Sequence, residues 1–108
     1  MAKTIRLTPA LFHVLLALAE GEKHGYGIML EVRERTAGSV KLGPGSLYWL
    51  LDRLEEADLI TETKPRRGQS DDQRRNYYKL TRNGSRILKE EAAKLADIVK
   101  LARARNVL

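Results

Sequence analysis

A helical apolar face followed directly by a hairpin pattern constrains the fold of this chain most. Apolar side chains occupy positions 47, 50, 51, 54 and 57, and this spacing predicts one face of an amphipathic helix. Residues 59–64 and 76–80 then alternate apolar and polar side chains, as strands of a β-hairpin do. A polar, arginine-rich segment separates them, so we predict a helix that leads straight into a long hairpin.

Two more helices are predicted before this unit. Thr8 can cap a helix and Pro9 fits its first position, and an apolar run over residues 11–19 follows. A second helix is expected from about Gly25 to Thr36, and a short strand at residues 39–42. The order helix, helix, short strand, helix, strand, loop, strand indicates a winged helix-turn-helix. The predicted fold class is therefore mainly α with a small β-hairpin.

The C-terminal region is predicted to be one long helix of about 25 residues, capped by Thr81. Its apolar positions step by four and three residues, as in a coiled coil. The winged-helix part ends near Leu80 and offers no long groove to cover them, so we expect a homodimer contact. We divide the chain into a DNA-binding domain at residues 1–80 and a dimerisation helix at 81–108. The expected contact residues are Leu88, Ala92, Leu95, Val99 and Ala102.

The charge of the chain is concentrated in one place. Residues 64–86 contain eight basic and two acidic side chains, which equals the whole net charge of +6. A charge run is usually only a solvated face, but this concentration on one hairpin favours a polyanionic partner. Nucleic acid is the first candidate and an anionic membrane surface the second.

Composition and motifs argue against several other classes. The chain has no cysteine, which removes disulfides and thiolate chemistry and favours an intracellular protein. The apolar run at residues 11–19 is too short to span a bilayer, so we expect a soluble protein with a cytoplasmic location, and among the partners we favour DNA over a membrane. The two histidines lie in unrelated segments, and no glycine-rich phosphate loop is present. We therefore expect no enzyme activity, no cofactor and no metal.

Three segments carry a family resemblance. "HGYGI" (24–28), "GPGSLYWLLDRLEEADLI" (43–60) and "RRNYYKLTRNGSRIL" (74–88) resemble the PadR-like transcriptional regulators, the phenolic acid decarboxylase regulator family. The resemblance covers essentially the whole chain. It implies a winged helix-turn-helix repressor that dimerises through its C-terminal helix and binds an inverted-repeat operator. Many relatives have glycine where this chain has Asp58, which tolerates the left-handed conformation better than most residues.

The expected DNA contacts fall into three groups. A recognition helix fits the major groove and its first residues meet the base edges, whereas a wing follows the backbone or enters the minor groove. Tyr48 and Trp49 can either contact DNA or pack against the hairpin or a partner subunit. Tyr26 can equally be a half-buried core residue, and His24 can also be a helix cap or a structural hydrogen-bond donor. The groups are the recognition helix (Ser46, Tyr48, Trp49, Arg53), its flanks (Lys23, His24, Tyr26, Lys41) and the wing (Arg66, Arg67, Arg74, Arg75).

Two other functions fit the same pattern. The basic hairpin could bind an acidic protein partner, or the winged helix could bind double-stranded RNA by shape. Several relatives bind flat apolar compounds between their C-terminal helices, so the resemblance leaves the existence of a small-molecule effector open. Residues 82–108 contain no aromatic side chain, so stacking from that helix is unavailable and the effector is unknown.

Overall fold

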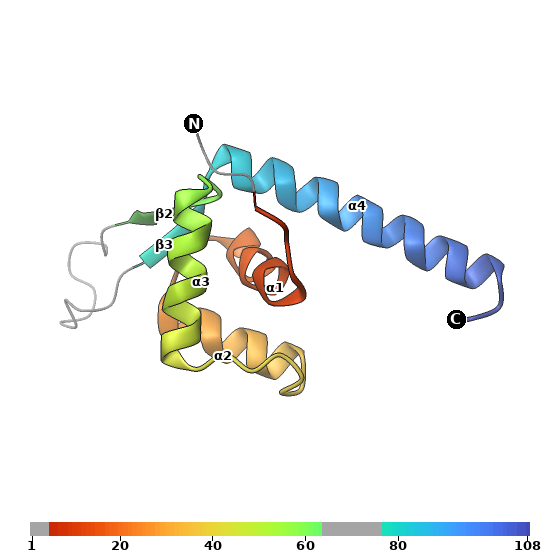
Figure 1. Cartoon of the computed structure of the whole chain (residues 1–108), viewed down its shortest axis with the longest axis horizontal. Helices are drawn as coiled ribbons and strands as arrows, with labels where there is room; N and C mark the ends of the chain where they lie inside the picture. Colours follow the sequence, from red (N-terminus) through yellow and green to blue (C-terminus); the bar gives the residue numbers. More distant parts are fainter. Residues whose placement is uncertain (1–4, 64–76) are drawn as a thin grey trace.

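The computed structural model describes residues 5–63 and 77–108, and it confirms a mainly helical fold with a small antiparallel sheet. Figure 1 shows how the helices and strands are arranged. The elements are α1 (Pro9–Ala17), the short 3-10 helix η1 (Leu18–Glu20), β1 (Lys23–His24), α2 (Gly25–Arg35), α3 (Pro44–Glu56), β2 (Ile60–Thr63), β3 (Tyr77–Leu80) and α4 (Arg82–Ala104).

Side-chain caps fix the starts of three helices. The first N–H groups of a helix lack partners within the helix, and a capping side chain accepts a hydrogen bond from one of them. Thr8 Oγ1 accepts from Leu11 N at 3.3 Å, and Thr81 Oγ1 accepts from Gly84 N at 2.9 Å. His24 Nδ1 accepts from Gly27 N at 2.9 Å. Both predicted threonine caps are confirmed, and His24 is a cap as well.

The third strand of the sheet does not lie where it was predicted. The strand order of the sheet is β1-β3-β2, and β3 is antiparallel to both neighbours. The short strand predicted at residues 39–42 is wrong, because these residues form a loop that is anchored by the buried side chain of Leu42. The third strand is β1, where Lys23 pairs with Tyr78 and His24 with Tyr77. It forms here because the chain runs beside the open edge of β3 before it enters α2.

A tight turn joins α3 to β2 through Asp58. Asp58 adopts φ 61°, and Leu59 N donates to Leu54 O at 2.9 Å across the turn. A left-handed residue with such a bond is a common way to end a helix. The expectation that aspartate can take this conformation is confirmed.

The core lies between α1, α2, α3 and the sheet. Apolar side chains from one face of α2 and α3 meet α1, which is buried on most of its circumference. Tyr78 of β3 is buried in this core, as predicted. The fully buried larger side chains are Val14, Leu15, Ile28, Val32, Leu47, Leu51 and Leu54.

The helix α4 starts in this core and then extends away from the other helices (Figure 1). A Cβ at Gly84 would lie 1.8 Å from the carbonyl oxygen of Leu59, so only glycine permits this approach. Leu88 is only 7% exposed and belongs to the core of its own chain. Leu88 was predicted to contact a second subunit, and this is corrected: its side chain is already covered, because the first two turns of α4 pack on the winged-helix core. The division of the chain at residue 81 stays a prediction.

Candidate nucleic-acid interface

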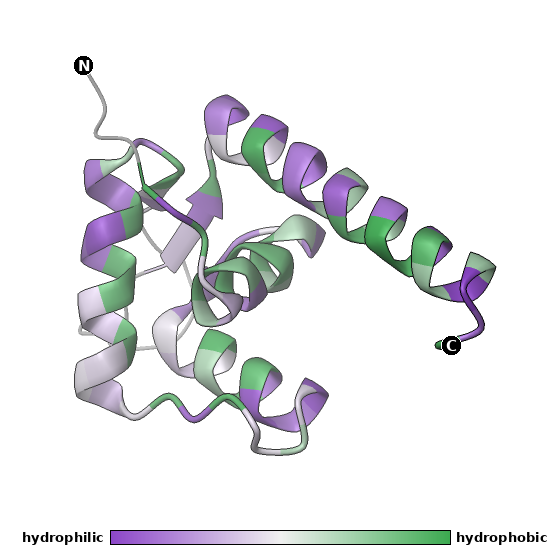
Figure 2. Ribbon diagram, turned by 45° about the vertical axis from the view of Figure 1, so that its right-hand side comes forward, coloured by the Kyte–Doolittle hydropathy of each residue, from purple (hydrophilic) through white to green (hydrophobic). Residues whose placement is uncertain are grey.

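The outer surface of α3 gathers all four predicted recognition-helix residues. Figure 2 shows the apolar side of this helix turned toward the interior, where its leucines are buried. Ser46 and Arg53 are exposed on the other side, Tyr48 is 46% exposed and Trp49 is 59% exposed. The four side chains therefore lie within three turns of one helix and face solvent.

The charges on α3 are confined to its second half. From Pro44 to Leu51 the helix has no charged side chain, whereas Asp52, Arg53 and two glutamates follow. The N-terminus of a helix also carries a partial positive charge from its aligned peptide dipoles. The first half of α3 can therefore approach a polyanion without repulsion from carboxylates.

One carboxylate at the far end of α3 is perturbed. Burial raises the pKa of Glu55, and the nearby carboxylates of Glu62 and Asp52 raise it further. These acids cluster where α3 runs into β2, away from the helix start. The acidic end of α3 is thus separated along the helix from Ser46 and Tyr48.

Tyr48 is held against the start of α2. A Cβ at Gly25 would lie 3.2 Å from the Tyr48 hydroxyl oxygen and 3.5 Å from Leu47. The absence of a side chain at Gly25 lets the tyrosine ring lie close to the α2 backbone. Tyr48 is consequently oriented by the protein, while nearly half of its surface stays exposed.

Trp49 does not pack into the core, and its partner is Arg53. The guanidinium carbon of Arg53 lies 4.9 Å from the centre of the Trp49 ring, within the range of a cation–π contact. With 59% of its surface exposed, Trp49 is not buried against the described residues. Contact with DNA and packing against a partner subunit both stay predictions.

The four flanking residues differ in their surroundings. Lys41 is exposed, and Tyr26 is exposed over half of its surface, so it is not a core residue. The His24 ring caps α2. It is stacked with the Tyr26 ring, with 6.4 Å between ring centroids, and meets the Tyr77 ring edge-on at 5.6 Å between centroids.

Lys23 already has two acidic partners. Its ammonium group pairs with Glu31 at 3.0 Å and with Glu20 at 3.3 Å. These pairs neutralise Lys23 and weaken the case for a phosphate contact there.

The four predicted wing arginines, Arg66, Arg67, Arg74 and Arg75, lie outside the described residues. The strands β2 and β3, between which this segment runs, are paired from Ile60↔Leu80 to Thr63↔Tyr77. The role of the wing arginines stays a prediction.

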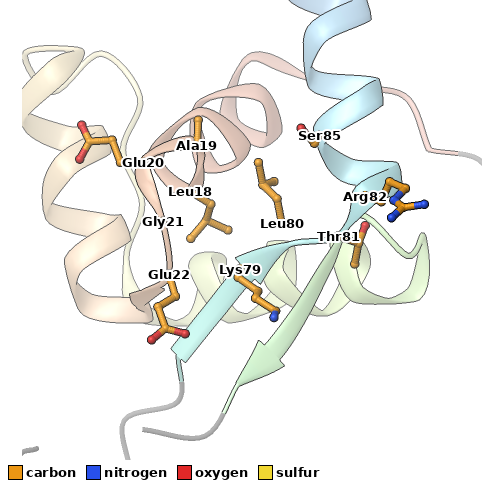
Figure 3. A pocket seen from close by; sticks show the side chains of 10 residues that line it. All are labelled: Leu18, Ala19, Glu20, Gly21, Glu22, Lys79, Leu80, Thr81, Arg82 and Ser85. Carbon is orange, nitrogen blue, oxygen red and sulfur yellow. The ribbon is translucent and has the colours of Figure 1, made fainter. Parts of the chain in front are cut away.

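Surface grooves also lie away from the exposed face of α3, and two of them bear on the predicted residues. The first lies between the η1–β1 turn and the β3–α4 junction, and Leu18 and Leu80 line it (Figure 3). Its two glutamates have partners of their own, since Glu20 pairs with Lys23 and Glu22 accepts a hydrogen bond from Thr63. No residue of α3 contributes to this groove.

The second groove is apolar and runs between α1 and α4. Phe12, His13 and Leu95 line a volume of about 260 Å³ there. Burial lowers the pKa of His13, and the positive charge of Arg35 lowers it further. Arg35 lies against His13, with 3.3 Å between a guanidinium nitrogen and Nδ1 and 3.4 Å to the His13 carbonyl oxygen.

Comparison with known proteins identifies the family. Residues 14–90 match the transcriptional regulator PadR-like family. The chain belongs to this family.

Solved structures of PadR regulators share the fold. A PadR family transcription regulator from Clostridium difficile R20291 is 30% identical, with a TM-score of 0.75 over 90% of this chain and 97% of that one. Bacillus subtilis PadR in complex with operator DNA is 23% identical, with a TM-score of 0.64 over 76% of this PadR-like chain and 45% of that one. The second likeness shows the fold alone.

Curated relatives of this PadR-like regulator are often longer. An uncharacterized 37.1 kDa protein in transposon TN4556 of Streptomyces fradiae is 38% identical over 94 residues, which are 87% of this chain and 25% of that protein. The transcriptional regulator YqjI of Escherichia coli is 29% identical over 87% of this chain and 42% of its own length. The PadR-like chain therefore spans a quarter of the first relative and less than half of the second.

Several features of the PadR-like site were missed by the sequence analysis. The spacing of Trp49 and Arg53, four residues apart on a helix, could have indicated their contact. The pairs that Lys23 forms with Glu20 and Glu31 depend on how the β1 segment meets α2, which periodicity does not show.

Among residues 5–63 and 77–108, no helix is long and apolar enough to cross a membrane.

Proposed function

We propose that this PadR-like regulator binds double-stranded DNA sequence-specifically, as a homodimer on an inverted-repeat operator, and represses transcription without catalysing a reaction. The observation that carries the proposal is the outer face of α3. Its uncharged first half presents Ser46, Tyr48 and Trp49 to solvent at the positive end of the helix.

The geometry of α3 suits the major groove. A B-DNA major groove is about 12 Å wide and admits an α-helix, whose N-terminal residues meet the base edges. The hydroxyl groups of Ser46 and Tyr48 can donate or accept hydrogen bonds there. The likeness in fold to Bacillus subtilis PadR, whose structure contains operator DNA, supports this use of the winged helix.

Residues around α3 would contact the DNA backbone. Lys41 is exposed two residues before the N-cap of α3, and Tyr26 is exposed in the first turn of α2. The wing arginines Arg66, Arg67, Arg74 and Arg75 would add phosphate contacts, which position a protein without specifying sequence. Lys23 is left out of this set because two carboxylates already pair with it.

The proposal of a homodimer is supported by the exposed part of α4. Leu95 and Val99 are each 42% exposed, and Ile98 and Leu101 are more exposed still. Such a row of apolar side chains along one helix is typical of a surface that a partner covers. Ala92 and Ala102 lie on the same side by their spacing and would let two helices approach closely, whereas Leu88 packs in its own chain.

Two copies joined along α4 would present two α3 helices to two half-sites, which is why we infer an inverted repeat. A dimer bound there would cover its operator and block other proteins from it. Repression is therefore the simplest regulatory outcome.

The test is the effect of Tyr48→Ala on sequence preference. An operator is selected from random duplexes with the wild-type protein, and its affinity is compared with that of random DNA and of duplex RNA. Loss of a base contact costs about 1–3 kcal/mol of discrimination, whereas a phosphate contact discriminates by almost nothing. Tyr48→Ala should narrow the gap between operator and random DNA, with little change in non-specific affinity.

Two further variants make the result specific. Tyr48→Phe removes the hydroxyl and keeps the ring against Gly25, so it separates hydrogen bonding from packing. Leu30→Ala truncates an exposed side chain of α2 outside the proposed contacts and serves as the control. A folded Tyr48→Ala protein with full operator preference would remove Tyr48 from the recognition surface. The proposed function would be overturned if the wild-type protein bound duplex RNA more tightly than DNA, or if it bound all DNA sequences equally well.

A further inference from the structure

Trp49 and Arg53 lie one turn apart on α3, with the guanidinium of Arg53 over the indole ring of Trp49. We propose that they act as one recognition unit, in which Trp49 holds Arg53 in position to read a guanine in the operator half-site. This inference rests on the proposed function and goes beyond it, because it names the base that α3 recognises and the residue that positions the reader.

The surroundings of Arg53 show that the indole is its preferred partner. Asp52 is its neighbour in sequence, and Glu56 follows three residues later. Even so, within the part of the chain that the structure describes, Arg53 forms no ion pair with either carboxylate. Its guanidinium lies 4.9 Å from the centre of the Trp49 ring instead.

Stacking leaves the hydrogen-bonding edge of the arginine available. A guanidinium is planar and carries five N–H donors around its rim, so a contact through its face uses none of them. An ion pair with a carboxylate would occupy two of those donors. The stack on Trp49 therefore restricts the side chain and keeps the fork of donors open to a ligand.

The direction of helical side chains places this fork where a base would lie. Side chains of an α-helix lean toward its N-terminus, so a residue covers the turn before its own Cα. Arg53 belongs to the acidic second half of α3, yet its guanidinium is delivered to the level of Trp49. Trp49 belongs to the uncharged first half of the helix, which is the part proposed to enter the groove.

Guanine is the base that matches this group. In the major groove it presents two adjacent acceptors, O6 and N7, which an arginine fork can bind together, whereas adenine presents a donor beside its acceptor. Holding the fork against an indole also lowers the rotamer freedom lost when the base is bound. Trp49 is thus a positioning residue for the contact that Arg53 makes.

The experiment uses the full chain and the operator selected from random duplexes. Each guanine of a half-site is replaced in turn by 7-deazaguanine, which lacks the N7 acceptor. Wild type, Trp49→Ala, Arg53→Lys and the double variant are measured on each duplex and on random DNA. Arg53→Lys keeps the charge and loses the fork, so it should reduce the preference for one guanine by about 5- to 150-fold.

Trp49→Ala should weaken the preference for the same guanine by about two- to five-fold, and by nothing further when Arg53 is already lysine. Trp49→Phe keeps a weaker aromatic face, so its preference for this guanine should lie between the preferences of wild type and of Trp49→Ala. Arg33→Lys makes the same exchange at an exposed residue of α2 and should change no base preference.

Two results would overturn the recognition unit and leave the proposed function intact. In one, the Trp49 and Arg53 variants change preferences at different base pairs. In the other, their effects multiply independently, so that Trp49→Ala weakens binding as much with lysine at position 53 as with arginine. A wild type without any sequence preference would instead overturn the proposed function, and the inference with it.

Discussion

The contact between Gly84 and the backbone of Leu59 gives the sharpest test of the packing. Gly84 lies in the first turn of α4, and its amide donates to the Thr81 cap. A methyl group added there would meet the Leu59 carbonyl oxygen at 1.8 Å and its carbonyl carbon at 2.8 Å. Both are backbone atoms, so no flexible side chain can move aside to relieve the clash.

The size of the effect of Gly84→Ala follows from three contributions. Overpacking a close contact costs about 1–3 kcal/mol. Displacement of the Leu59 carbonyl would also break its hydrogen bond from Thr81 N at 3.1 Å, and such a bond contributes about 0.5–1.5 kcal/mol. The higher helix propensity of alanine than of glycine offsets this loss by up to about 1 kcal/mol. We therefore expect a net loss of about 0.5–4.5 kcal/mol in the free energy of unfolding.

Denaturant unfolding followed by circular dichroism measures this loss directly. For a domain of this size, 1 kcal/mol shifts Tm by about 4–8 °C, so a thermal melt should show the change as well. Gly45→Ala is the matched control, because a Cβ there has no heavy atom within 4 Å and the residue is also near the start of a helix. It should be neutral or slightly stabilising. If Gly84→Ala were as stable as Gly45→Ala, the close approach of α4 to Leu59 would be wrong.

Two further predictions concern α4 and α1. Leu95→Asp combined with Val99→Asp should give a monomer in sedimentation and weak operator binding in a DNA-binding assay, because both side chains are exposed on the proposed dimer surface. A wild-type protein that is monomeric at tens of micromolar would contradict this. The pKa of His13 is lowered from its ordinary 6.5, so the unfolded state binds more protons and stability should fall as pH drops below about 6.5. In a His24→Asn background, which keeps an N-cap, His13→Gln should flatten the slope of unfolding free energy between pH 8 and 5.5; an unchanged slope would contradict the assignment.

The helical parts of the fold could be predicted because their signals are local. The caps at Thr8 and Thr81 and the leucine spacing of α3 depend on residues within one or two turns of each other. The two hairpin strands, predicted at residues 59–64 and 76–80, form at residues 60–63 and 77–80. These patterns were enough to fix the order of the main elements and to place Ser46 and Tyr48 on the open face of α3.

The parts that were predicted wrongly depend on distant segments. The strand β1 exists because the edge of β3 lies beside it, and nothing within residues 23–24 indicates this pairing. Leu88 continues a coiled-coil spacing in the sequence, yet Gly84 brings this turn of α4 onto the core and buries it. Periodicity shows which side of a helix is apolar, but it does not show where along the helix the cover changes from the same chain to a partner.

One junction connects the two surfaces on which the proposed function depends. At the end of α3, Leu59 N donates to Leu54 O, and the Leu59 carbonyl accepts from Thr81 N and lies against Gly84. The Asp58 carbonyl accepts from Thr81 Oγ1 at 2.6 Å. The end of α3, the proposed recognition helix, and the start of α4, the proposed dimer helix, are therefore held together through the backbone of two adjacent residues. In a dimer joined along α4, this junction would set the distance and angle between the two α3 helices, and thus the half-site spacing that the regulator can bind.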